Sequence, residues 1–158
     1  MFDRDAVQIR SAAMADIDIV RAIVRAAYAK WVPVIGREPM PMKADYERAL
    51  REHALDLLQA DGQPVALIEM IMRPDHLFIE NVAVTPTRQG QGFGRHLLAH
   101  AERKARAAGL PAVHLQTNAA FEANVRLYQA FGYRIDREEP FMGGTSVYMS
   151  KVISEGWS

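Results

Sequence analysis

The spacing of apolar residues predicts that the chain begins with a short strand followed by two helices. Residues 7–10 alternate between apolar and polar side chains, as a half-buried strand does. Over residues 17–27 the apolar positions recur every three or four residues, which predicts a helix with Asp16 at its N-cap. Residues 31–42 contain three prolines and a glycine, so we interpret them as a loop. A second helix is predicted over about residues 43–53.

The rest of the chain changes to the period of strands and then alternates between helices and strands. Apolar runs on either side of Asp61-Gly62 indicate a hairpin, because this pair favours a tight turn. The predicted order is β-α-α-β-β-β-α-β-α-β-β, an α/β fold with one mixed sheet in a single domain over residues 1–158, of which about 7–151 form the ordered core. The later elements are strands 55–60, 64–72 and 76–84, a helix ending at Gly109, strand 113–116, helix 121–131, and strands 133–137 and 146–149.

The composition narrows the class of protein. Hydrophobic residues make up 49% and charged residues 24%, a balance typical of a folded domain. The 19 basic residues equal the 19 acidic ones, so we expect neither nucleic acid nor a membrane as a partner. The absence of cysteine excludes disulfides, thiolate metal sites and a cysteine nucleophile. Residues 1–5 lack the pattern of a signal peptide, and no stretch is long and apolar enough to span a membrane, so a cytoplasmic location is expected.

A glycine-rich segment is the strongest sign of a binding site. Residues 88–95, Arg-Gln-Gly-Gln-Gly-Phe-Gly-Arg, lie between a predicted strand and a predicted helix. Alternate glycines let the backbone approach a ligand closely, and the free N–H groups at a helix start favour an anion such as phosphate. Arg88 and Arg95 add positive charge at either end. The alternative is a glycine-rich connection without a ligand, because short glycine motifs often match by chance.

The spacing of these glycines differs from that of two well-known phosphate-binding motifs. A Walker A loop requires Gly-Lys followed by Ser or Thr, whereas Gly94 is followed by Arg95 and His96. A dinucleotide-binding fingerprint requires a third glycine at the position that Arg95 occupies. The segment is therefore not a nucleotide-binding loop of either kind.

The chain resembles the GNAT superfamily of acyl-CoA-dependent N-acetyltransferases. Residues 89–94, Gln-Gly-Gln-Gly-Phe-Gly, match every fixed position of the family signature Gln/Arg-x-x-Gly-x-Gly/Ala. As in the family, the signature follows a strand, here residues 80–84, and opens a helix. The predicted element order also fits the family from residue 7 to residue 151. Further residues that resemble the family's second cofactor segment are Thr117, Asn118, Asn124, Tyr128, Gly132 and Tyr133.

This resemblance implies acetyl-CoA as the co-substrate and assigns residues to it. In relatives, the strand before the signature splays away from its neighbour, and the pantetheine arm of the cofactor pairs with the exposed strand backbone. The signature turn then holds the pyrophosphate. The residues implied to bind acetyl-CoA are Val82, Ala83, Val84, Gln89, Gly90, Gln91, Gly92, Phe93, Gly94, Arg95 and Asn124.

Two residues are candidates for the chemistry. Because no cysteine and no Ser/His/Asp arrangement is present, we expect the acceptor amine to attack the thioester directly. The resemblance places Tyr128 near the sulfur, where it could protonate the leaving thiolate. A core tyrosine is the alternative. Glu80 is the candidate base because strand alternation puts it on the face of Val82 and Val84; the alternative is a strand glutamate paired with a cation.

The acceptor is less well defined by the sequence. In the family, the first helices and their connecting loop often line the acceptor site, so Tyr28, Trp31 and Met40 are candidate lining residues. An apolar and aromatic wall favours a small amine with an apolar body or an amino-acid-like molecule, although Tyr28 and Trp31 could equally cap the core. A homodimer is compatible with the sequence.

Several other functions remain open. The acceptor could be a protein or peptide amine, or the chain could be a non-catalytic acyl-CoA sensor or a nucleotide-binding module. No metal is expected: His96 and His100 have the i,i+4 spacing of zinc ligands, but the glutamate of the metalloprotease motif and a third ligand are missing.

Overall fold

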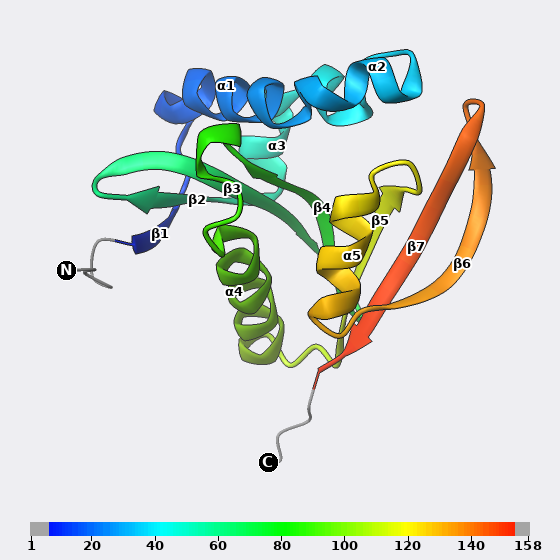
Figure 1. Cartoon of the computed structure of the whole chain (residues 1–158). Coiled ribbons are helices and arrows are strands. Elements are labelled where there is room, and N and C mark those ends of the chain that lie inside the picture. The colour runs from blue at the N-terminus through cyan, green and yellow to red at the C-terminus, as the bar shows by residue number, and fades with distance from the viewer. Residues whose placement is uncertain (1–6, 154–158) are drawn as a thin grey trace.

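The computed structural model of the chain describes residues 7–153, so residues 1–5, for which no signal peptide was expected, lie outside the described part. The elements alternate much as predicted (Figure 1). The strands are β1 (Val7–Ser11), β2 (Ala54–Ala60), β3 (Gln63–Met72), β4 (Leu77–Val84), β5 (Ala112–Asn118), β6 (Arg134–Phe141) and β7 (Gly144–Val152), and the α-helices are α1 (Ile17–Tyr28), α2 (Val32–Ile35), α3 (Tyr46–Glu52), α4 (Phe93–Ala107) and α5 (Glu122–Ala130).

All seven strands belong to one sheet in the order β1-β2-β3-β4-β5-β7-β6. Neighbouring strands are antiparallel except for β4 and β5, which run parallel. The predicted mixed α/β sheet is therefore confirmed. The hairpin between β2 and β3 is also as predicted, with positive φ angles at both Asp61 and Gly62, as a type I′ turn requires.

Helices cover both faces of the sheet and divide the core into two clusters (Figure 1). On one face, α4 and Tyr128 of α5 pack against apolar residues of β3, β4, β5 and β7. On the other face, α1 and α3 pack against residues of β2, β3 and β4. Among the described residues, no helix is both long enough and apolar enough to cross a membrane.

Two local predictions need correction, and one is confirmed with a difference in detail. The segment predicted as a loop over residues 31–42 contains the short helix α2, which ends at Gly36 in the left-handed conformation. Strands β6 and β7 are longer than predicted. Their added residues are largely polar and do not alternate with apolar ones, so the sequence pattern did not indicate a strand there. Asp16 is the N-cap residue of α1, as predicted. Its carboxylate makes no capping hydrogen bond to α1 among the described residues; it accepts one from the backbone of Ala13 and pairs with Arg10.

Candidate active site

The sheet opens between β4 and β5. These strands pair only at three positions, from Leu77 opposite Val113 to Ile79 opposite Leu115. Among the described residues, β5 continues beyond this point with β7 as its sheet neighbour, and residues 80–84 of β4 pair with no strand on that side. Within residues 7–153, the carbonyls of Val82 and Val84 accept hydrogen bonds only from the side chains of Tyr28 and Gln89. Another extended chain can therefore pair with this edge. The splay implied by the family resemblance is thus present.

The glycine-rich turn closes one end of this opening. Gly90 and Gly92 have φ angles of 80° and 84°, a region that residues with a Cβ rarely adopt. Gly92 is the residue before α4, so the free N–H groups of this 15-residue helix start at the turn. A Cβ on Gly94 would come within 3.0 Å of Leu127 on α5. The backbone conformation therefore favours glycine at the first two positions, and close packing favours it at the third.

A cavity of about 390 Å³ extends along the turn and the free edge of β4. Its lining includes three cations, Lys30, Arg88 and Arg95, and no carboxylate from the described residues. This charge and the N-terminus of α4 favour an anionic ligand such as a pyrophosphate. Of the residues assigned to acetyl-CoA, those lining the cavity are Val82, Ala83, Val84, Gln89, Gly90, Gly92, Phe93, Gly94, Arg95 and Asn124.

Two assigned residues lie elsewhere than expected. Gln91 is absent from the cavity lining, and its side chain accepts a hydrogen bond from Arg88 at 3.2 Å. Trp31, expected at the acceptor site, lines this first cavity and stacks on Phe121 with 4.7 Å between ring centroids. Lys30 was not predicted at all. It donates to the Gln89 side chain at 3.0 Å, which in turn donates to the carbonyl of Val84.

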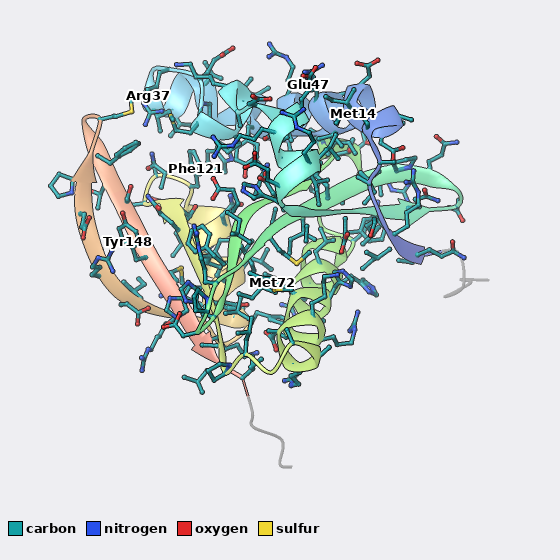
Figure 2. All side chains as sticks on the ribbon, turned by 180° about the vertical axis from the view of Figure 1, so that it is seen from behind. Met14, Arg37, Glu47, Met72, Phe121 and Tyr148 are labelled. Carbon is teal, nitrogen blue, oxygen red and sulfur yellow. The ribbon has the colours of Figure 1, made fainter. Side chains whose placement is uncertain are left out.

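A second cavity, of about 360 Å³, lies on the α1–α3 side of the opening. Its lining includes Met40, a candidate acceptor residue, and aromatic residues from distant parts of the sequence, including Phe78 and Phe141. Figure 2 shows the tip of the β6–β7 hairpin reaching toward Arg37, and the Arg37 guanidinium lies 5.8 Å from the centroid of the Phe141 ring. The hairpin and the α2 segment therefore approach each other on one side of this cavity.

The two cavities share Tyr28, Val82 and Tyr128. Tyr128 is buried, and no hydrogen bond to its hydroxyl is present among the described residues. The hydroxyl is not completely enclosed by protein, so it can be reached from the cavities. Burial raises the pKa of Tyr128 to about 12, so the phenol keeps its proton at neutral pH. Asn124, four residues earlier, lies on the same helix face and lines the first cavity. The junction thus holds a protonated donor without a structural partner.

A β-bulge lies at Glu80. In the pairing of β3 with β4, Glu69 lies opposite Asn81 and Met70 opposite Ile79, so Glu80 is the extra residue. Ile79 belongs to the α4-side core, whereas Asn81 bonds to Tyr28 of α1 on the other side. The Glu80 prediction assumed that side chains of β4 alternate strictly between the two faces of the sheet. The bulge interrupts this alternation, so Glu80 and Val82 need not lie on the same face.

Glu80 nevertheless lines the second cavity, where its side chain is exposed. Partial burial among cavity walls raises the pKa of its carboxyl, and the nearby charge of Glu69 raises it further, while His53 and Arg73 lower it. No ion pair to Glu80 is present within residues 7–153, so the alternative of a strand glutamate paired with a cation has no support there. A carboxyl whose pKa is raised holds a proton more readily and is therefore a better base for an amine.

A buried polar network, not predicted from the sequence, surrounds the bulge. The Tyr28 hydroxyl donates to the Asn81 side chain at 2.6 Å, and the Asn81 amide donates to the Tyr46 hydroxyl at 3.2 Å. Tyr46 in turn donates to the carbonyl of Pro41 at 2.7 Å. These bonds tie α1, β4 and the start of α3 together, so they fix the shape of the second cavity.

The histidines considered for zinc have other environments. His100 is bonded to the buried carboxylate of Asp56 at 2.7 Å, and His96 is exposed. Over residues 7–153 no group of three or more His, Cys, Asp or Glu side chains is arranged to hold a metal ion.

Comparison with known proteins identifies the family to which this arrangement belongs. A splayed parallel pair of strands, a glycine turn at the start of a helix and a cation-lined cavity together suit an extended, phosphate-bearing ligand at the edge of a strand. The sequence model of the Acetyltransferase (GNAT) family matches residues 20–133, and the chain belongs to that family. The resemblance inferred from the signature is confirmed, as is the assignment to acetyltransferases at the level of the family.

Individual relatives are more distant. The chain is 37% identical over 83 residues to a mycothiol acetyltransferase of Nocardiopsis dassonvillei, a match that covers 52% of the chain and 22% of that relative. The fold is similar to the ribosomal-protein-S18-alanine N-acetyltransferase of Escherichia coli (TM-score 0.77, 22% identity, 94% of both chains). It is also similar to PaiA N-acetyltransferase of Thermoplasma acidophilum in complex with coenzyme A (TM-score 0.78, 17% identity, 93% of this chain and 99% of that one). These structural likenesses confirm the fold.

Proposed function

We propose that the chain transfers an acetyl group from acetyl-CoA to a primary amine of a small molecule by direct attack. The observation that carries this proposal is the meeting of two cavities of different character at Tyr28, Val82 and Tyr128. A cation-lined cavity suits the phosphates of CoA, and a cavity with carboxylates and aromatic rings suits an amine with an apolar body. The shared wall is then the place where thioester and amine meet.

In this mechanism the residues of the chain perform three tasks. The open edge of β4 at Val82 and Val84 binds the pantetheine arm, and a backbone N–H near the bulge stabilises the oxyanion that forms when nitrogen attacks the thioester carbon. Glu80 accepts the ammonium proton through water, because an amine with a pKa of about 10.4 is otherwise protonated at neutral pH. Tyr128 donates its proton to the departing sulfur and is reprotonated by the second proton that the nitrogen loses as the amide forms.

A small acceptor is favoured over a peptide by the walls of the second cavity. The α2 segment and the tip of the β6–β7 hairpin approach each other at Arg37 and Phe141, which narrows the space that an extended peptide would need. Protein or peptide acetylation is the second candidate. The E. coli structural neighbour acts on a ribosomal-protein alanine, but its 22% identity carries no substrate to this chain. A non-catalytic acyl-CoA sensor would have the first cavity without turnover.

The deciding experiment measures release of free CoA thiol from acetyl-CoA with a panel of small primary amines and N-terminal peptides. We expect turnover with small amines that have an apolar body. Thermal shifts with acetyl-CoA, CoA and ATP serve as the binding control, because a ligand at 100 times its Kd stabilises the fold by about 2.7 kcal/mol. Binding of acetyl-CoA without turnover on any amine would indicate a sensor, and turnover only on peptides would contradict the small-molecule proposal.

A further inference from the structure

A buried carboxylate on β3 lines the acceptor cavity and has no role in the mechanism above. Glu69 interrupts the apolar run of β3 and is only 4% exposed, yet it belongs to the cavity lining. An ionised carboxylate in such a place requires a partner. Within the described residues no lysine or arginine lies within ion-pair distance of Glu69. Its partner is His53, whose Nδ1 lies 2.6 Å from Glu69 Oε2.

His53 connects this carboxylate to solvent. It follows the last residue of α3, and its side chain is 24% exposed, whereas the Glu69 side chain is 5% exposed. His53 is not among the residues that line the acceptor cavity. The pair therefore has two ends, a carboxylate that meets the cavity and an imidazole that meets water. With Nδ1 bonded to the carboxylate, the other ring nitrogen is the one left to exchange protons with solvent.

The other groups that face Glu69 do not connect the cavity to solvent in this way. From α1 and α3 it faces the hydroxyls of Tyr28 and Tyr46, and burial raises the pKa of both phenols, so they stay protonated near neutral pH. From β4 it faces Asn81, which does not titrate, and Glu80 at the bulge. Arg73 in the β3–β4 turn acts on Glu80 as a permanent cation.

We propose that Glu69 and His53 act together as the group that takes the proton released by the acceptor amine and returns it to solvent. The proposal rests on the proposed acetyl transfer. The ammonium proton passes through cavity water, directly or by way of Glu80, to the Glu69 carboxylate, and the hydrogen bond to His53 passes a proton on to solvent through the imidazole. His53 therefore acts through Glu69 without contacting the substrate.

The test compares three variants with the wild type in the CoA-release assay over a range of pH. His53→Asn keeps an N–H donor near Glu69 but cannot titrate, and His53→Ala leaves a space open to solvent. Glu69→Gln removes the charge at the cavity. We expect kcat to fall about 10- to 100-fold in each variant near neutral pH. This loss does not exceed the smallest loss that is typical for removing a directly acting acid or base. The defect should shrink at high pH, where the free amine is already abundant.

Imidazole separates proton transfer from support of the fold. Added imidazole should restore kcat in His53→Ala but not in Glu69→Gln, and acetyl-CoA affinity should stay constant in all three variants. An unchanged kcat in His53→Asn, or a loss in His53→Ala that imidazole leaves untouched while the protein remains folded, would overturn the pair as a proton carrier. A wild type that turns over no amine would contradict the proposed function and the pair together, whereas an active wild type with active variants contradicts the pair alone.

Discussion

The two cavities that meet at Tyr128 differ in which parts of the chain form their walls. The first is defined by backbone: the free edge of β4, the glycine turn and the start of α4, with three cations and no carboxylate from the described residues in its wall. The second is defined by side chains from segments far apart in the sequence, and its wall contains both acids and bases, Glu69 and Glu80 with Arg37 and Lys43. A ligand common to a whole family suits the first, and a ligand particular to one protein suits the second.

The difference matters for how substitutions act. A backbone site tolerates changes of side chain but fails when the main-chain conformation changes, whereas a side-chain site loses affinity or rate residue by residue. We therefore expect the largest effect from the glycine turn, smaller effects from the residues at the junction, and the smallest from the outer wall of the acceptor cavity.

Replacing Gly92 by valine should abolish CoA binding while the protein remains folded. At a φ of 84° a β-branched residue is strained, so the turn must change its conformation and the N–H groups at the start of α4 lose their common direction. Calorimetry with CoA measures this directly. The matched control is Gly109→Val, at a φ of 74° beyond the other end of α4, where a Cβ likewise meets no atom within 4 Å. Both variants should lose stability, but only the first should lose CoA. Unchanged affinity in Gly92→Val would contradict the site.

Replacing Tyr128 by phenylalanine should lower kcat and leave acetyl-CoA affinity nearly constant. The change removes only a hydroxyl that makes no hydrogen bond within residues 7–153, and positioned acids contribute typically ~10²–10⁴-fold. Tyr133→Phe is the control: its ring centroid lies 6.2 Å from that of Tyr128, and its buried hydroxyl is also unpaired. Removing an unsatisfied buried hydroxyl should be neutral or stabilising and should not change kcat. Equal rates for wild type and Tyr128→Phe, with chemistry rate-limiting, would make Tyr128 a packing residue.

The same contrast explains how much could be predicted from the sequence. The first cavity depends on a contiguous segment in which glycine is required by the local backbone conformation, so the signature was enough to locate it. The second depends on Glu69, Asn81 and Phe141, which only the folded sheet brings together. The bulge at Glu80 changes the face of every later β4 residue, and residue spacing alone carries no sign of an extra residue in one strand. The charge of Glu69 within an apolar run was the one available signal.

Replacing Glu80 by glutamine should lower kcat/KM about 10²-fold near neutral pH, with the defect shrinking as the pH approaches the pKa of the amine, because solvent then supplies the free base. A loss that is independent of pH would instead indicate a role in positioning. Stability gives a second readout. The fold raises the pKa of this carboxyl, so it disfavours the charged form, and its contribution is lost as the pH rises through the raised pKa. The glutamine variant should therefore be at least as stable as the wild type at neutral pH and gain nothing at low pH.

The smallest effect is expected at the outer wall of the acceptor cavity, where Phe141→Ala should raise the KM for the amine with little change in kcat. Phe141 is 38% exposed, and Arg37 lies over one side of its ring. Removing the ring should therefore expose only part of the apolar body of a bound amine to solvent. A loss of about 1 kcal/mol corresponds to a KM rise of about fivefold. Met142→Ala, at the next position and 59% exposed, is the control because it does not line the cavity, and it should leave KM unchanged. The effect should also grow with the size of the apolar part of the amine, since a larger body contacts more of the missing ring. A KM that is unaffected for every amine would mean that the hairpin tip stands clear of the acceptor, and it would remove the main argument for a small molecule over a peptide.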